Sequence, residues 1–82
     1  MNTREAVARR IVELCSIRGI TLNALARESA VPPSTLKNMI NPNGGSKNPG
    51  IVTIKMLCDG LEISLQEFFD TDVFKNLEQE IQ

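Results

Sequence analysis

The sequence predicts an all-α fold, and three observations point to it. Apolar residues recur at helical spacing in most segments, turn-forming residues separate those segments, and no stretch alternates apolar and polar residues as a strand does. The 82 residues are enough for one small domain with a thin core. Hydrophobic residues make up 41% and charged residues 23%, which are ordinary globular proportions, so the composition excludes a disordered or fibrous chain.

The first predicted helix spans residues 3–18. Apolar residues recur along one face of this helix at intervals that correspond to helical turns, and a charged residue follows them at its end. The residues of that face are Val7, Ile11, Leu14, Cys15 and Arg18. Thr3 is the expected N-cap of this helix, and Gly19 is its expected C-terminal stop.

The second and third helices are predicted over residues 22–29 and 33–40, joined by a three-residue turn. Thr21 is the expected N-cap of the second helix, whose apolar face is short. The residues of that face are Leu22, Leu25 and Ala26. Pro33 suits the first position of the third helix, because its missing N–H group costs nothing there.

The third predicted helix has two distinct faces. Leu36, Met39 and Ile40 are expected to point inward. The polar residues at helical spacing on its other side are Ser34, Lys37, Asn38 and Asn41. From the pattern alone, this polar stripe is either an ordinary solvated helix face or a binding surface.

Residues 41–50 are rich in turn formers and predict an exposed loop. A fourth helix follows over residues 51–61. Its expected buried residues are Ile51, Ile54, Leu57, Cys58 and Leu61. Ser64 and Glu67 form the expected capping box of a one-turn helix that carries Phe68 and Phe69, as the end of the core or as a partner-binding wedge.

The last residues continue with helical spacing of apolar side chains. These are Val73, Phe74, Leu77 and Ile81. We therefore expect a domain over residues 1–70 and an acidic tail over residues 71–82. The tail is expected to pack on the body or to form a dimerisation helix, with a frayed terminus as the alternative.

Charge is distributed unevenly along the chain. The formal net charge is −1, which taken alone argues against a nucleic-acid partner. Residues 1–58 hold eight basic and three acidic residues, a net of +5, whereas residues 59–82 hold seven acidic residues and only Lys75, a net of −6. The sequence thus predicts a basic body and an acidic tail.

Several functional classes are excluded by what the sequence lacks. There is no His, so neither a general base working near pH 7 nor a histidine metal site is expected, and we predict neither an enzyme nor a cofactor. Cys15 and Cys58 are too few for a four-thiolate zinc site, and both are expected in the core. No long apolar run suggests a signal peptide or membrane span, so we expect no membrane partner and a cytoplasmic location.

The predicted helix pair resembles a known family. The run GITLNALARESAVPPSTLKNMI at residues 19–40 is similar to the helix-turn-helix of the Cro/lambda-repressor type, the xenobiotic-response-element family. Residues 48–61 and 63–69 resemble the fourth and fifth helices of that family, so the similarity covers about residues 5–69. The resemblance implies a five-helix DNA-binding domain whose third helix enters the major groove of double-stranded DNA.

The resemblance also implies site residues. It gives base-facing positions to Pro33, Ser34, Lys37 and Asn38, and phosphate-facing positions to Leu22 and Asn41. The chemistry of the side chains adds further phosphate contacts, because a capped helix N-terminus and polar loop residues can hold the DNA backbone. These are Thr21, Asn43, Ser46, Lys47 and Asn48, with loop solubility as the alternative for the last two.

The sequence departs from the family pattern at several positions. Leu22 and Pro33 stand where the family commonly has glutamine. Cys15 and Ile40 stand where many members have an Arg–Glu ion pair, so apolar packing is expected to replace it. These departures and the acidic tail leave two hypotheses open: a sequence-specific transcriptional regulator, expected to act as a homodimer without a small-molecule effector, or an antitoxin-like protein-interaction module.

Overall fold

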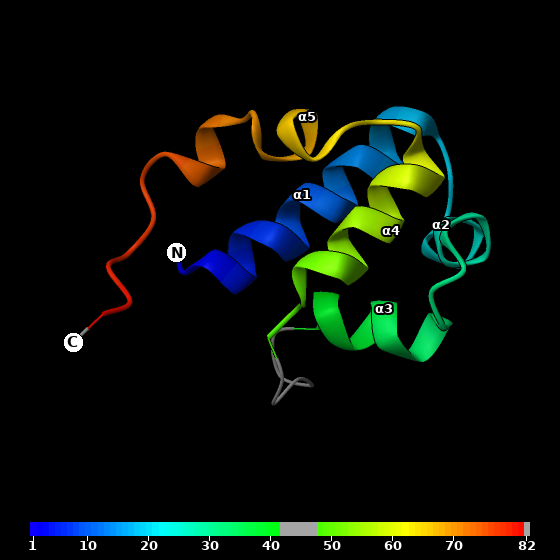
Figure 1. The fold of residues 1–82 in the computed structure, drawn as a ribbon, viewed down its shortest axis with the longest axis horizontal. Helices are drawn as coiled ribbons and strands as arrows, with labels where there is room; N and C mark the ends of the chain where they lie inside the picture. The colour runs from blue at the N-terminus through cyan, green and yellow to red at the C-terminus, as the bar shows by residue number, and fades with distance from the viewer. Residues whose placement is uncertain (42–47, 82) are drawn as a thin grey trace.

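The computed structural model describes residues 1–41 and 48–81. Within them it contains five α-helices and one 3₁₀ turn, and no strand, so the all-α prediction is confirmed. The elements are α1 (Thr3–Arg18), α2 (Leu22–Ser29), α3 (Pro33–Ile40), α4 (Ile51–Leu61), α5 (Leu65–Phe69) and η1 (Asp72–Phe74). Figure 1 shows α3 at the bottom of the view and α5 at the top, with α1 and α4 between them.

Local sequence signals explain most helix ends. Gly19 ends α1 in the left-handed conformation, with φ at 66°. Ser64 and Glu67 form the expected capping box of α5. The predicted N-cap of α1 is wrong: Asn2, not Thr3, holds that position, because Asn2 and Glu5 bond reciprocally to each other's backbone N–H at 2.8 and 3.1 Å. A carboxylate at the third helical residue completes this box only when the cap is Asn2.

One continuous core joins the helices. Its buried side chains come from α1 to α5 and from the turn before α3. They are Val7, Ile11, Leu14, Cys15, Leu25, Ala26, Val31, Leu36, Met39, Ile54, Leu57, Cys58, Leu61 and Phe68. α2 packs against α4 and α3, and α3 packs against α1. Ile40 and Leu22 are only partly buried against this core.

The expected burial of Ile51 is wrong, since 58% of this residue remains exposed. Ile51 is the first residue of α4, and it extends past the core that Ile54 enters one turn later. Val52, its neighbour, is 70% exposed. The first turn of α4 therefore presents apolar surface instead of burying it.

The tail is helical only over Asp72–Phe74. Phe74 packs against Phe69 with ring centroids 4.9 Å apart, which fixes the start of the tail on the body. Residues 77–81 have no regular secondary structure, and Ile81 is 79% exposed, so helical spacing failed as a guide there. A segment this short gains little from helix formation without a packing surface along its length.

The backbones of α2 and α4 come close together at Ser29 and Gly60. A Cβ atom added at Gly60 would lie 2.0 Å from the Ser29 Oγ and 3.1 Å from its Cα. Ser29 is itself buried, and its hydroxyl has no hydrogen-bond partner. Gly60 is thus required for α2 to sit against α4.

Candidate nucleic-acid interface

The unit of α2, turn and α3 is built from local signals. The Thr21 Oγ1 accepts a hydrogen bond from the Ala24 N–H at 3.0 Å, so its predicted role as N-cap of α2 is confirmed. Ala30 ends α2 with a left-handed backbone, φ 56°. Val31 is 3% exposed, and its N–H donates to the Ala26 carbonyl at 3.0 Å. A buried side chain in the middle of the turn therefore fixes the angle between the two helices.

α3 divides into the two faces that its sequence predicts. Leu36 and Met39 are buried, at 1% and 6% exposure. The polar stripe lies on the surface together with Pro33: the exposed residues are Pro33, Ser34, Lys37, Asn38 and Asn41. Thr35 is exposed as well and was not singled out from the sequence, although its place beside Ser34 on the first turn of α3 could have indicated it.

The predicted phosphate-facing residues have different environments. Thr21, Asn41 and Asn48 are exposed, whereas Leu22 is partly buried against the core. The remaining three lie outside the described residues: Asn43, Ser46 and Lys47. The described members are at the first turn of α2, the end of α3 and the segment before α4.

Three arginines of α1 bind the C-terminal ends of three other helices. Arg4 donates to the Asn38 and Asn41 carbonyls at the end of α3, at 3.2 and 3.5 Å. Arg10 donates to carbonyls at the end of α5, and Arg18 donates to a carbonyl at the end of α4. Their acceptors are the carbonyls of Glu67 and Phe68 for Arg10, at 2.8 and 2.7 Å, and of Leu61 for Arg18. Cations suit helix C-termini, where backbone carbonyls lack partners.

These internal contacts reduce the cationic surface that the net charge of +5 on residues 1–58 led us to expect. Arg4, Arg10 and Arg18 hold the fold together, and Lys55 forms an ion pair with Asp59. Lys37 on α3 and Arg27 on α2 are exposed within the helix pair. Net charge therefore overstates the number of cations that the interface can offer.

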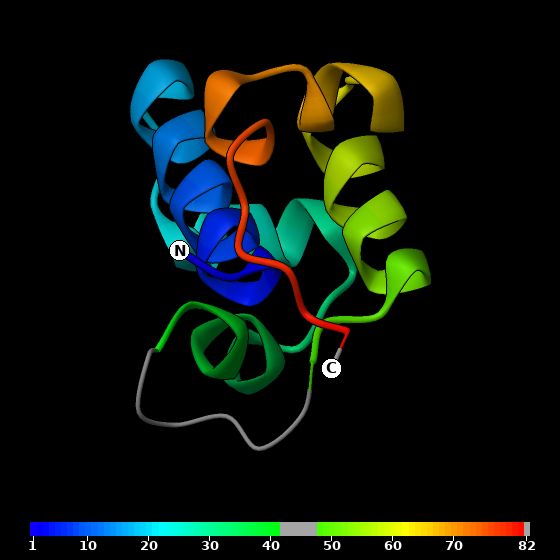
Figure 2. The same ribbon diagram turned by 90° about the vertical axis from the view of Figure 1, so that its left-hand side faces the viewer.

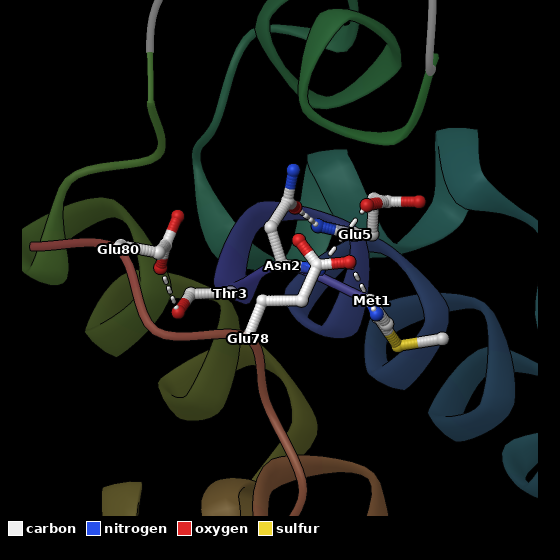
Figure 3. Close-up of polar contacts among 6 residues, drawn as sticks. All are labelled: Met1, Asn2, Thr3, Glu5, Glu78 and Glu80. Carbon is white, nitrogen blue, oxygen red and sulfur yellow. Dashed lines mark hydrogen bonds and ion pairs between the residues drawn. The ribbon is translucent and has the colours of Figure 1, made fainter. Parts of the chain in front are cut away.

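The acidic tail contacts the N-terminus of the chain and the first turn of α1, as Figure 3 shows. The Met1 ammonium group pairs with the Glu78 carboxylate at 3.0 Å, and the Glu78 N–H donates to the Met1 carbonyl at 3.1 Å. The Thr3 hydroxyl donates to the Glu80 carboxylate. Figure 2 shows the tail running from η1 along the N-terminal part of α1 toward the end where α3 lies.

The two cysteines belong to the core. Cys15 and Cys58 are free thiols at 5% and 0% exposure, and burial raises the pKa of both above the usual thiol value. A raised pKa keeps them in the protonated form, which is a poor nucleophile. Within residues 1–41 and 48–81, no group of three or more acidic or cysteine side chains could hold a metal ion. No helix in those ranges has the length and apolar content needed to cross a membrane.

Comparison with known proteins agrees with this geometry. Residues 10–73 match the model of the Cro/C1-type HTH DNA-binding domain. The chain belongs to this family of helix-turn-helix DNA-binding domains, which confirms the resemblance seen in the sequence. The family consists of non-enzymatic DNA-binding proteins, so the prediction that the chain is not an enzyme is also confirmed.

Solved structures with the same fold include regulators. The crystal structure of the prophage Lp1 protein 11 matches with a TM-score of 0.78 and 33% identity, over 94% of this chain and 100% of that one. An HTH_3 family transcriptional regulator from Vibrio cholerae matches with a TM-score of 0.72 and 30% identity, over 85% of this chain and 38% of that one. The restriction-modification controller protein C.Esp1396I shares the fold at 24% identity, with a TM-score of 0.72 over 82% of each chain. No curated protein sequence gives a significant match.

Proposed function

We propose that this protein is a sequence-specific transcriptional regulator that reads duplex DNA with α3. The observation that carries the proposal is the exposed polar stripe on a helix whose other face is buried against the core. In the proposal, Asn38 pairs with adenine, Lys37 donates to guanine, and Pro33 and Ser34 contact bases at the start of the helix. DNA binding is assigned to residues 1–70, and residues 71–82 form a tail.

Backbone contacts would orient α3 on the duplex. The capped N-terminus of α2 at Thr21 offers backbone N–H groups and a favourable dipole to one phosphate. Residues at and after the end of α3 are proposed for the flanking phosphates: Asn41, Asn43, Ser46, Lys47 and Asn48. Leu22, partly buried, can offer only its backbone N–H to the same phosphate as Thr21.

A homodimer is part of the proposal. One domain of this size buries less DNA surface than high affinity requires, and two copies would read half-sites about 34–36 Å apart. The exposed apolar residues Ile51 and Val52 at the start of α4 provide surface for such an association.

The experiment that tests the proposal is a titration with generic duplex DNA at low salt, followed by backbone amide shifts. DNA binding predicts shifts concentrated in residues 33–38 and 41–48. The protein-interaction hypothesis predicts no shifts at all, and that outcome would rule out the proposed function. Shifts confined to α4 and α5 would place the DNA on the wrong face.

The salt dependence of binding should be moderate. Three α1 arginines and Lys55 are engaged within the protein, which leaves four cations of the body. Three of these belong to the helix pair and the loop after it, and the proposal assigns about these three to DNA in each protomer: Arg27, Lys37 and Lys47. A dimer would then give a slope of log affinity against log salt of about −5, because each neutralised phosphate contributes about −0.9. Isothermal titration between 50 and 300 mM salt measures this slope. A slope near −10 would mean that the α1 arginines leave their helix ends to bind phosphate.

The tail carboxylates should weaken DNA binding. Glu78 and Glu80 lie at the first turn of α1, whose Arg4 contacts the end of α3. The double change Glu78→Gln and Glu80→Gln should tighten non-specific binding about two- to fourfold at low salt, and the gain should vanish at high salt. The matched control is Asp70→Asn with Asp72→Asn, one residue just before the tail and one at its start. If the control tightened non-specific DNA binding equally, the effect would come from net charge and not from the position of Glu78 and Glu80.

A further inference from the structure

α3 is the one α-helix of the described chain that has neither a side-chain N-cap nor a left-handed C-cap. It begins at Pro32, which makes no capping hydrogen bond, and ends at Asn41 with φ −72° and ψ 117°. The other four α-helices each have at least one of these caps. Their N-cap side chains are Asn2, Thr21 and Ser64, and their left-handed C-caps are Gly19, Ala30 and Glu62.

Arg4 binds the backbone at the C-terminal end of α3, which has no left-handed cap. Its Nη2 donates to the Asn38 carbonyl, in the last turn, and to the Asn41 carbonyl, just past it. The Asn38 carbonyl belongs to the last turn of α3, where helix carbonyls have no hydrogen-bond donor within the helix. Arg4 is separated from Asn38 by 34 positions in the chain and from Asn41 by 37. The end of α3 is therefore held by a different helix, α1.

The dipoles of α1 and α3 have opposite effects on the charge of Arg4. Arg4 lies in the first turn of α1, where the helix dipole disfavours a cation. At the C-terminal end of α3 the same cation is favoured. The Nε of Arg4 is also buried without a partner, which disfavours the position further. The favourable interactions of Arg4 are therefore those with α3, not those with its own helix.

We propose that Arg4 is a positioning residue for DNA recognition, acting through α3 without touching DNA. The inference rests on the proposed function, in which Asn38 reads a base. Arg4 binds the backbone carbonyl of Asn38, so it holds the backbone from which the Asn38 side chain extends. Bidentate base reading tolerates only small errors in the position of that backbone, and fraying of the last turn would exceed them.

The test compares Arg4→Gln with Arg9→Gln, a control that removes the same charge from an exposed arginine of the same helix. Each variant is titrated with the duplex selected by the wild type and with an unrelated duplex, over a salt series. Amide hydrogen exchange of residues 38–41 is measured in the free proteins. Arg4→Lys, which keeps the charge but loses the planar fork, is included because it preserves packing if the glutamine variant unfolds.

Positioning predicts a loss of about tenfold in affinity for the selected duplex in Arg4→Gln, and a smaller loss in Arg4→Lys. Affinity for the unrelated duplex and the salt slope should match those of Arg9→Gln. Exchange at residues 38–41 should be at least about tenfold faster than in the control. Equal losses on both duplexes, or a salt slope reduced by about 1, would make Arg4 a phosphate contact and overturn the proposal.

Exchange separates this inference from the proposed function. Unchanged exchange at residues 38–41 would show that Arg4 does not hold the end of α3, whatever the DNA results. If the wild type selects no sequence at all, the proposed function fails and the positioning role fails with it. Faster exchange in Arg4→Gln would then still establish the contact as a structural cap.

Discussion

Replacing both Lys37 and Asn38 with alanine should lower the preference for the selected DNA sequence about 100-fold or more. Each good base contact contributes about 1–3 kcal/mol of discrimination, and the proposal pairs these two exposed side chains of α3 with bases. Both are on the surface, so the free energy of unfolding should change by no more than about 0.5 kcal/mol per residue. Competition binding against unrelated duplex measures the preference.

The chain offers a matched control for this double variant. Lys75 and Asn76 are the same pair of residue types, adjacent and exposed in the tail. Alanine at both should leave the sequence preference unchanged. If the Lys37 and Asn38 variant keeps the preference of the wild type, base reading by α3 is wrong. A loss of the same size in the tail variant would instead point to a general charge effect.

Gly60→Ala should destabilise the fold by about 2 kcal/mol and lower the midpoint of thermal unfolding by about 10 °C. In an unobstructed helix this change would stabilise, since alanine is a better helix former than glycine. Here the new Cβ meets the Ser29 Oγ at 2.0 Å, so α2 and α4 must move apart. Because α2 carries Thr21 and leads into α3, DNA affinity should fall as well.

Two further variants identify the cause of that loss. Ser29→Ala removes the overlapping atom, and it also removes a buried hydroxyl without a partner. Ser29→Ala combined with Gly60→Ala should therefore recover part of the lost stability. The recovery should be incomplete, since the Ser29 backbone remains 3.1 Å from the new Cβ. Gly50→Ala is the control, because nothing lies within 4 Å of its Cβ position. Equal losses at Gly50 and Gly60 would rule out the close approach as the cause.

The sequence predicted the elements whose signals are local. Thr21, Pro33 and Gly19 mark helix ends by their own chemistry, and each has the predicted place. The cap at Asn2 had an equally local signal in Glu5 three residues later, and it was missed because Thr3 also fits a cap. The expected burial of Ile51 was wrong for another reason, and the helical spacing of the tail residues did not continue as a helix past Phe74. Whether an apolar residue is buried depends on what lies opposite, which helical spacing does not specify.

The candidate site shows the same division. The polar stripe of α3 follows from the positions of Leu36 and Met39 within one helix, so it could be predicted. The roles of Arg4, Arg10 and Arg18 could not, because each contact joins residues more than 30 positions apart. Cys15 and Ile40 pack in or against the core, as expected where the family often has an ion pair. The charge of the body was predicted correctly, but its availability to DNA was not.

Sequence-specific recognition by α3 can be measured by selection from a random duplex library. The wild-type protein at moderate salt should enrich one sequence, arranged as two half-sites about 34–36 Å apart. The Lys37→Ala and Asn38→Ala double variant, still folded, should enrich nothing under the same conditions. A wild-type protein that binds the library without enriching any sequence would contradict sequence-specific recognition by α3.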